Sequence, residues 1–497
     1  LSALYMNNKN YDKAIFFIKK IYKLNKKNPN VILSLAHAYE LNNEFNNSIN
    51  YYNEYLNINK NDKKIFNQIG CIYQNRNEPD KALSYFLKGY DLDQKDKLLI
   101  NNIFLSYIKK RDFHNSNIFF KIAKEIDSDY IEFKYNYAEF CILNNKVDEA
   151  IYILKENQNN IKFLVKLINL YFNLGRKEEG YNLLKINTRE IEKNKFFHNF
   201  LAIRYLYQGE FEKGWKYYSS FDPSIPNFYK EFIEYKDLNL LDLSDKHILV
   251  YNDQGIGDAI QFSKFILPLL KIAKKVTFSV QDNIFDLFNP NIKNLKIEKR
   301  SQKKIENIDG KISLSSLIKF FYTTKLNKND HILKIKNIND IKHNLIKSNK
   351  KLNVGLVWSG SSFSRSIPLK YFEKILNTDC NFYCLQNKVN EIDIDYFNSK
   401  NITDIGNFKL DELTAVIQRL DLVITIDTSL LHLSAALNVE TWGILNIDPD
   451  WRWGAIYNYN PYPSLIVFRQ QNYKDWNDVI DKIYNKLKNK IPQLKLF

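Results

Sequence analysis

Apolar residues through the first 218 positions follow a helical rhythm that repeats along the chain. Within each repeat one small residue stands at a fixed place. The series is Ala14, Ser48, Ala82, Ser116 and Ala150, each 34 apart, then Gly180, four residues early, and Gly214, again 34 later. Nine residues before each of these stand Tyr5, Tyr39, Tyr73, Tyr107, Cys141, Tyr171 and Tyr205. Such regularity predicts a stack of helix pairs over residues 1–218.

This period, with a tyrosine in one helix and a small residue in the next, resembles the tetratricopeptide repeat. The small residue lets the second helix approach the first closely, and the tyrosine ring is expected to fill the layer between neighbouring repeats. A solenoid of this kind has a concave groove. Capture of an extended peptide or protein partner is the leading interpretation; a passive spacer or a self-association surface is the alternative.

The pattern changes after residue 218. Prolines and short polar turns indicate a connector over 219–245, and apolar runs then alternate with helical stretches, which is typical of an α/β domain. The region 289–350 is expected to join two halves, 246–350 and 351–497. Expected strands are 247–251, 275–280, 353–358, 381–386, 421–426 and 440–445; expected helices include 259–274, 368–377, 410–419 and 429–437.

Composition adds few constraints. The net charge is +16, from 72 Lys and Arg against 56 Asp and Glu. The lysines are scattered, so we attribute the charge to compositional drift rather than to nucleic-acid or membrane binding. The four cysteines lack the spacing of a zinc site. No run of about 18 apolar residues is free of charge, so we expect no transmembrane segment. A reduced, metal-free, cytoplasmic protein is the expectation.

Two polar clusters follow predicted strands, where open α/β sheets bind ligands. The first is "NDQGIGDAIQF" (252–262), in which two glycines precede Asp258. Taken alone, Asp258 reads as a helix cap. The second is "IDTSLLH" (426–432), a helix start with hydroxyls that suits a phosphate group; a capping motif with a packed histidine is its alternative. Arg365, in a Ser/Gly-rich turn, has the forked guanidinium that binds a diphosphate.

These stretches, together with "GEFEKGWKYY" (209–218), "VGLVWSGSSFSRSIPL" (354–369) and "PDWRWG" (449–454), resemble the heptosyltransferase-like glycosyltransferases of family nine. The resemblance implies a GT-B fold, with two Rossmann-like halves and a final helix, about 474–489, packed back on the first half. It also implies an inverting, metal-independent transfer from a nucleotide-diphosphate sugar, with no cofactor and with Asp258 as the general base. The residues it implies for donor or acceptor binding are Gly255, Gly257, Gln261, Trp358, Ser359, Gly360, Arg365, Ser366, Gln386, Asp427, Thr428, Ser429, His432 and Arg452.

Within that set, Arg365, Ser366, Thr428, Ser429 and His432 are implied to neutralise the leaving diphosphate. Gln386 and Asp427 are implied to touch the nucleoside, and Trp358 and Trp451 to form the cleft wall. The acceptor is a protein recruited by the repeats, or a saccharide. The alternative from another class is a non-catalytic scaffold with a degenerate transferase domain; nucleic-acid binding rests on charge alone.

Overall fold

The structure is a computed structural model that describes residues 1–218, 232–235, 242–301, 305, 307–321, 332–334, 346–347, 350–360, 365–454 and 462–491. Most of the predicted connector and residues 361–364 of the Ser/Gly-rich turn lie outside these ranges. The chain divides into two compact units, Leu1–Leu167 and Ile168–Phe497. The division falls inside helix α11 (Ile161–Asn173).

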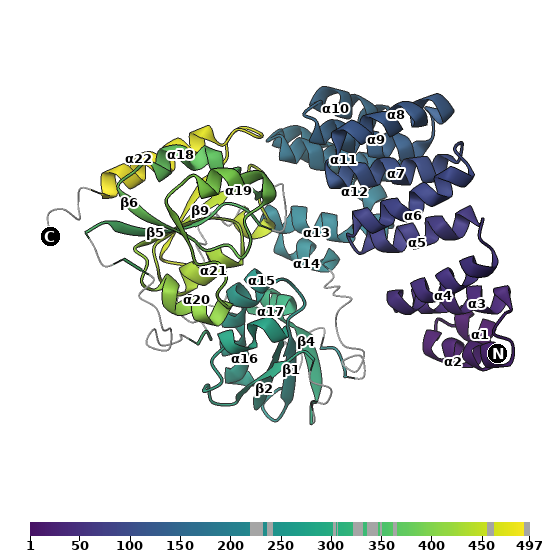
Figure 1. The fold of residues 1–497 in the computed structure, drawn as a ribbon. Helices are drawn as coiled ribbons and strands as arrows, with labels where there is room; N and C mark the ends of the chain where they lie inside the picture. Colours follow the sequence, from purple (N-terminus) through teal and green to yellow (C-terminus); the bar gives the residue numbers. More distant parts are fainter. Residues whose placement is uncertain are drawn as a thin grey trace. The chain divides into compact units, whose positions relative to one another are not determined.

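The first unit is helical (Figure 1). Its helices are α1 (Ser2–Asn7), α2 (Tyr11–Leu24), α3 (Pro29–Leu41), α4 (Phe45–Ile58), α5 (Lys63–Asn75), α6 (Pro79–Leu92), α7 (Lys97–Lys110), α8 (Phe113–Asp127), α9 (Ile131–Leu143) and α10 (Val147–Glu156). Asparagine and aspartate side chains cap several of them. Asn10, Asn28, Asp62, Asp96 and Asp112 each accept a backbone N–H of the first helical turn, which satisfies donors that the helix itself leaves unpaired.

The backbone confirms the 34-residue period. The turn inside each helix pair contains one left-handed residue, five positions before the small one. These are Lys9, Asn43, Asn77, Arg111 and Asn145, with φ between 56° and 62°, then Gly175 and Gly209 at 76° and 81°. The five non-glycine small residues of the series are fully buried. The repeated helix pairs expected from the pattern are therefore present from residue 1 to residue 217.

The tyrosine packs against the preceding repeat, as Tyr39 does in a cluster with Ile15 and Ile18, and in five of its six occurrences it also packs within its own helix pair. Its ring meets an aromatic ring twelve residues later, on the second helix of the same pair. The pairs are Tyr5–Phe17, Tyr39–Tyr51, Tyr73–Tyr85, Tyr107–Phe119 and Tyr205–Tyr217, with ring centroids 5.5 to 6.1 Å apart. In these five repeats the tyrosine thus closes the helix pair on itself, because the small residue leaves room for the two helices to come within ring contact.

The second unit begins with repeat helices, the end of α11, α12 (Lys177–Lys193), η1 (Lys195–Phe197), α13 (His198–Tyr207) and α14 (Phe211–Tyr217). A first sheet follows, built of β1 (His247–Tyr251), β2 (Lys275–Val280), β3 (Leu295–Lys299) and β4 (Gly310–Ser313). The helices between and after these strands are α15 (Ile256–Phe262), η3 (Ser263–Phe265), α16 (Ile266–Ile272), η4 (Asp282–Leu287) and α17 (Leu314–Phe321).

The second sheet is built of β5 (Leu352–Val357), β6 (Cys380–Cys384), β7 (Ile402–Asp404), β8 (Leu422–Ile426), β9 (Thr441–Leu445) and β10 (Leu465–Arg469). Its helices are η7 (Leu369–Phe372), α18 (Glu373–Leu376), α19 (Glu391–Asn398), α20 (Leu410–Ile417), α21 (Ser429–Ala436), η8 (Trp451–Trp453) and α22 (Asn477–Lys490).

Both sheets are parallel in every described pairing. The first has the strand order β3-β2-β1-β4 and the second β10-β9-β8-β5-β6-β7. Numbered within each sheet, both follow the Rossmann order, in which the ligand crevice lies beyond the carboxyl ends of the first and fourth strands. In the first sheet these are β1 and β4, and in the second they are β5 and β8.

Two expectations need correction. Residues 289–350 do more than join two halves, since they supply β3, β4 and α17 of the first sheet. Their high Lys and Asn content hid the strands, because β3 has exposed lysines, Lys296 and Lys299, that interrupt its apolar run. The last helix, α22, packs on α18, η7 and β10 of the second sheet rather than on the first half. Lys374–Asp481 and Lys490–Glu440 ion pairs hold it there.

Candidate active site

One cavity of about 890 Å³ lies where the two sheets face each other, a volume suited to a nucleotide-sized ligand. The first sheet contributes the stretch from Gln254 to Asp258 and also Asn283. The second sheet contributes residues that follow five of its strands. They are Ser359, Gly360, Arg365, Leu385, Gln386, Asn387, Gly406, Asn407, Phe408, Lys409, Leu410, Leu413, Asp427, Thr428, Ser429, Leu430, His432, Asp450, Arg452 and Trp453.

The segment after β1 is fixed by buried polar contacts. Asp253 is buried, and its Oδ1 accepts the backbone N–H of Ser315 at 3.1 Å. Asn252 donates to Gln281 Oε1 at 2.7 Å. Burial raises the pKa of Asp253. Asp253 therefore holds the loop on the first sheet, and Asp258 is the carboxylate of this segment that faces the cavity.

Asp258 caps α15. Its Oδ2 accepts the backbone N–H of Gly255 at 3.0 Å, at the third position of a seven-residue helix. The cap interpretation of the sequence is thus observed. The capping contact uses one carboxylate oxygen of Asp258 and leaves the other free for a second partner.

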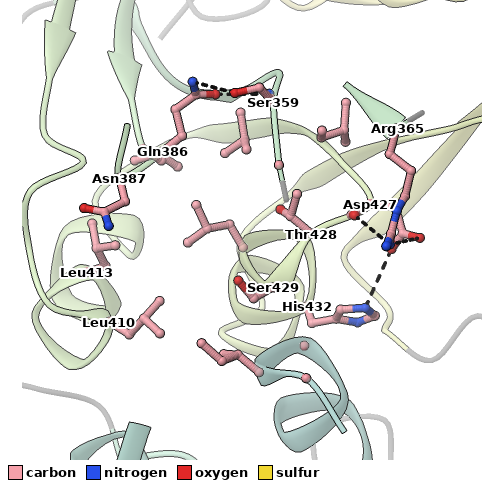
Figure 2. Close-up of a pocket in the computed structure, with 18 of the residues that line it drawn as sticks. Ser359, Arg365, Gln386, Asn387, Leu410, Leu413, Asp427, Thr428, Ser429 and His432 are labelled. Atoms are coloured by element: carbon pink, nitrogen blue, oxygen red, sulfur yellow. Dashed lines mark hydrogen bonds and ion pairs between the residues drawn. The ribbon is translucent and has the colours of Figure 1, made fainter. Parts of the chain in front are cut away.

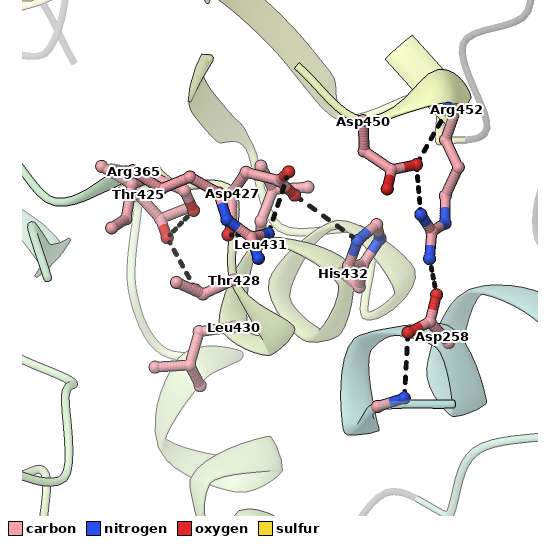
Figure 3. A network of polar contacts seen from close by, with 12 residues as sticks. Asp258, Arg365, Thr425, Asp427, Thr428, Leu430, Leu431, His432, Asp450 and Arg452 are labelled. Carbon is pink, nitrogen blue, oxygen red and sulfur yellow. Dashed lines mark hydrogen bonds and ion pairs between the residues drawn. The ribbon is translucent and has the colours of Figure 1, made fainter. Parts of the chain in front are cut away.

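That second partner is Arg452. Figure 3 shows its guanidinium between Asp258 and Asp450, with Nη2 on Asp258 Oδ1 and Nη1 on Asp450 Oδ1. The Arg452 side chain is 15% exposed and lies over the rings of Phe262 and Trp451. Burial lowers its pKa to about 10, so it stays charged at neutral pH. Its Nε is buried without a hydrogen-bond partner in the described structure.

Gly257 permits the close packing of α15 on α21, which lie side by side in Figure 1. A Cβ at this position would stand 2.9 Å from His432 Cδ2 and 3.4 Å from Ser429 Cα. The two helices therefore meet with no room for a side chain. The closest neighbour of Gly257 is His432, so this glycine brings the two predicted clusters together.

We expect Gly257→Ala to lower the free energy of unfolding by about 1–3 kcal/mol, because the methyl group forces two helices apart. Gly255→Ala is the matched control, since its Cβ would meet only the movable Asp258 Oδ2, at 3.3 Å. Thermal unfolding of both variants tests this. Equal losses would show that the helix contact at Gly257 is not tight.

The second cluster begins where β8 ends. Asp427 is 9% exposed, and Arg365 Nη1 lies 3.5 Å from its Oδ2 and 3.4 Å from its carbonyl oxygen. Thr428 is the N-cap residue of α21. Burial raises the pKa of Asp427 and the charge of Arg365 opposes that rise. An arginine and a helix N-terminus thus border the same part of the cavity, which favours an anionic ligand.

His432 is fixed within this cluster. Its Nδ1 lies 3.1 Å from Tyr462 Oη, its Nε2 3.9 Å from Asp427 Oδ1, and its ring stacks on Trp453 at 5.7 Å. Burial, with the charges of Lys264 and Arg365, lowers the pKa of His432 to about 3. The imidazole is therefore neutral at physiological pH.

This histidine makes stability depend on pH. The unfolded chain protonates it below its ordinary pKa of 6.5, whereas the folded chain does so only near 3. The unfolded state binds more protons in between, so stability falls as pH is lowered through that window. We expect His432 to account for about 2 kcal/mol between pH 7 and pH 5.

Urea unfolding at the two pH values checks this. The loss of stability between pH 7 and pH 5 should be absent in His432→Gln. It should be retained in the control His37→Gln, because His37 is exposed. An identical loss in wild type and His432→Gln would contradict it.

The other end of the cavity is more apolar. Figure 2 shows Leu410, Leu413 and Asn387 there, away from Arg365. Gly406 also lines this end. Only glycine fits at this position, because a Cβ would lie 1.9 Å from the Gln386 carbonyl oxygen. The pattern of the sequence did not reveal these residues, since the short strand β7 was not predicted. The Gly406-Asn407 pair before the predicted helix 410–419 is a turn signal that would have placed a loop here.

Several predicted residues also hold the cavity wall together through hydrogen bonds to one another. Gln386 Oε1 accepts the backbone N–H groups of Trp358 and Ser359 at 3.1 and 3.2 Å, and its Nε2 donates to Ser359 Oγ at 2.9 Å. Ser366 Oγ accepts the N–H of Gly360 at 3.2 Å. These side chains brace the loop after β5 and leave Gln386 few free hydrogen-bonding groups for a nucleoside.

Three predicted binding residues, Trp358, Gln261 and Ser366, are not among the described residues that line the cavity. Trp358 is fully buried, and its Nε1 donates to Asp393 Oδ2 at 3.0 Å. Gln261 is 4% exposed, on a face of α15 that packs into the core. Trp451 packs between Trp215 and Phe262. These side chains lie in the core because they pack on neighbouring buried residues. The sequence of a motif does not show which of its side chains are buried in this way.

Comparison with known proteins agrees with the two resemblances. Residues 1–28, 29–62 and 64–96 match the tetratricopeptide repeat family, and residues 394–473 match glycosyltransferase family 9 (heptosyltransferase). The chain therefore carries tetratricopeptide repeats followed by a heptosyltransferase-like segment. No curated protein matches the chain.

Among solved structures, a glycosyl transferase family 9 protein from Veillonella parvula is 16% identical; the match covers 50% of this chain and 91% of that one, with a TM-score of 0.37. A tetratricopeptide repeat protein from Parabacteroides merdae is 14% identical over 44% of this chain and 87% of that one, with a TM-score of 0.39.

Among the described residues, no helix is both long and apolar enough to cross a membrane. The same residues contain no group of three or more His, Cys, Asp or Glu side chains arranged to hold a metal ion.

Proposed function

We propose that the second unit is a glycosyltransferase that binds a nucleotide-diphosphate sugar in the cavity and transfers the sugar to an acceptor hydroxyl. The observation that carries this proposal is the shared cavity. Asp258 borders it from the first sheet, and Arg365, Asp427 and His432 border it from the second. The match of residues 394–473 to glycosyltransferase family 9 supports it.

The two ends of the cavity suit the two parts of such a donor. Leu410, Leu413 and Asn387 form an apolar wall with an amide, which fits a nucleoside base and ribose. Arg365 and the N-terminus of α21 fit the diphosphate. Positive charge from Arg365 and Arg452 would stabilise the leaving diphosphate without a metal ion.

Asp258 would be the general base. A carboxylate must be free to take the acceptor proton, and here Arg452 covers one oxygen while Gly255 covers the other. Arg452 borders the cavity, so a donor phosphate bound there would compete with Asp258 for its guanidinium. Deprotonation of the hydroxyl by one carboxylate, with attack opposite the leaving group, would invert the sugar carbon.

The experiment is donor turnover and product analysis. Incubation with a panel of nucleotide sugars should release a nucleoside diphosphate, and EDTA should leave the rate unchanged. Proton NMR of the product should show the anomeric configuration opposite to that of the donor. Loss of activity in EDTA would contradict the metal-free step, and a retained configuration would contradict the single displacement.

Nucleoside diphosphate affinity should depend on Arg365. We expect Arg365→Gln to weaken binding of UDP, ADP or GDP by at least about tenfold, since a hydrogen bond to a charged group is lost. Isothermal calorimetry measures it. Arg419→Gln is the control, because Arg419 is an exposed arginine between α20 and β8 that does not line the cavity. Equal affinity in the two variants would place the diphosphate elsewhere.

The repeats would recruit a protein acceptor or partner. A hollow of about 400 Å³ on the first unit, lined by Ser34, His37, Lys64 and Gln68 among others, supports this role. The second candidate function is a non-catalytic scaffold, favoured by the full pairing of Asp258 with Arg452 and Gly255. Binding of UDP, ADP or GDP without turnover of any nucleotide sugar would favour the scaffold.

A further inference from the structure

The loop after β9, residues 446–454, lies between the repeat helices of the second unit and helix α15. We call it the β9 loop. It carries Asp448, Asp450, Trp451 and Arg452, and it ends at Gly454. One side of this loop contacts the repeat helices of the second unit, and the other side contacts α15.

A buried ion pair holds the repeat side. Arg204, on α13, forms two parallel bonds to Asp448, Nη1 to Oδ1 and Nη2 to Oδ2, each 2.9 Å long. Their side chains are 9% and 6% exposed. The guanidinium also donates to Asn169 Oδ1 at 3.0 Å and lies 4.0 Å from the Phe172 ring centroid. A planar fork held on three sides fixes both the position and the direction of Asp448.

The ends of the loop pack as tightly. A Cβ on Gly454 would lie 2.5 Å from the Tyr207 carbonyl oxygen and 2.8 Å from Tyr207 Cα, so the two backbones touch. A Cβ on Gly175 would lie 2.4 Å from Ile447 Cδ1. Leu206 and Tyr207 belong to the same hydrophobic core as β1, β5 and β8. The last repeats are therefore part of the transferase core.

The other side of the loop contacts α15. Trp451 stacks on Phe262, with ring centroids 6.4 Å apart, and Arg452 pairs with Asp258. Trp215 of α14 meets the same Trp451 edge-on at 5.7 Å. One short loop thus joins a repeat arginine to the carboxylate that caps α15, and only three residues separate Asp448 from Arg452 along the chain.

We propose that Arg204 is a positioning residue for the transferase: through Asp448 it holds the β9 loop where Arg452 meets Asp258. This rests on the proposed function, in which Asp258 is the base. Arg204 is not among the described residues that line the cavity, so its effect passes through the loop. The final repeats then set the geometry of the reacting groups, a role distinct from recruiting a partner.

The test compares three variants of the full chain. Arg204→Gln/Asp448→Asn removes both charges and keeps side chains that can hydrogen bond, so no lone buried charge remains. Arg204→Lys keeps the charge and loses the fork. Glu139→Gln/Lys166→Gln is the matched control, because it removes a partly buried ion pair between repeat helices of the first unit.

We expect kcat for donor turnover to fall by about tenfold to a hundredfold in the uncharged pair and less in Arg204→Lys, with the donor KM changed less than about twofold. The control should keep the wild-type kcat. Unchanged kcat, or a loss confined to KM, would overturn the proposal. If the uncharged pair does not fold, Arg204→Lys decides by the same criterion.

A second measurement is independent of activity. The Tm losses of Arg204→Lys and Arg452→Gln should be less than additive in the double variant, since both act on the same loop contact. Additive losses would overturn the proposal. Should no nucleotide sugar be turned over, the proposed function fails, and this cycle alone still decides whether Arg204 and Arg452 are coupled.

Discussion

Asp258→Asn should lower kcat for sugar transfer by about 10²- to 10⁴-fold, the contribution typical of a general base. Donor affinity should change little, because asparagine keeps the size of the side chain and its oxygen can still accept the Gly255 N–H. Stopped-time assays with the active donor and calorimetry with the matching nucleoside diphosphate measure the two quantities separately.

The control for this experiment is Asp253→Asn. Asp253 holds the loop on Ser315 and does not line the cavity, so its loss should lower the Tm more than it lowers kcat. Asp258→Asn should do the reverse. An Asp258→Asn enzyme as fast as wild type would leave the carboxylate with the capping role alone and would exclude it as the base.

Removal of residues 1–217 should prevent the remaining chain from folding, whereas removal of residues 1–160 should not. The longer deletion removes Arg204, the partner of Asp448, and exposes the core contacts of Leu206 and Tyr207 to water. The shorter deletion ends before α11 and keeps all of these. We expect the Tm of this shorter-deletion fragment to stay within about 5 °C of the Tm at which the second unit unfolds in the full chain.

Soluble expression, circular dichroism and thermal unfolding distinguish the two deletions. The shorter one should still bind UDP, ADP or GDP as the full chain does, while transfer to a protein acceptor is lost. A folded, nucleotide-binding fragment from the longer deletion would show that the last repeats are not needed for the folding of the remaining chain.

The parts of the fold that depend on local pattern were predictable. Tyr39 and Ser48 mark a repeat because helix packing recurs every 34 residues, and the left-handed turn residue Asn43 follows the same count. Apolar runs such as 247–251 and 422–426 became strands because a parallel sheet buries both faces. Strands with exposed lysines, such as β3, escaped this pattern.

The sequence predicted the residues of the candidate site that directly follow the ends of predicted strands, and it predicted the others less well. Asp258, Arg365 and His432 border one cavity because parallel strands bring their carboxyl ends together. Trp358 and Gln261 stand in the same motifs but are buried in the core, since neighbouring positions on a strand or helix point in different directions. Sequence position alone does not resolve that direction for a single residue.

The sequence by itself determined the repeats, the alternation of strands and helices, and the motif order. The tertiary structure alone decided the partners of the charged groups. Arg204 and Asp448 are 244 residues apart, and Arg452 reaches Asp258 from the other sheet. Local pattern reflects backbone geometry and burial over a few turns, whereas an ion pair forms only where folding has brought two distant segments together and removed the water between them.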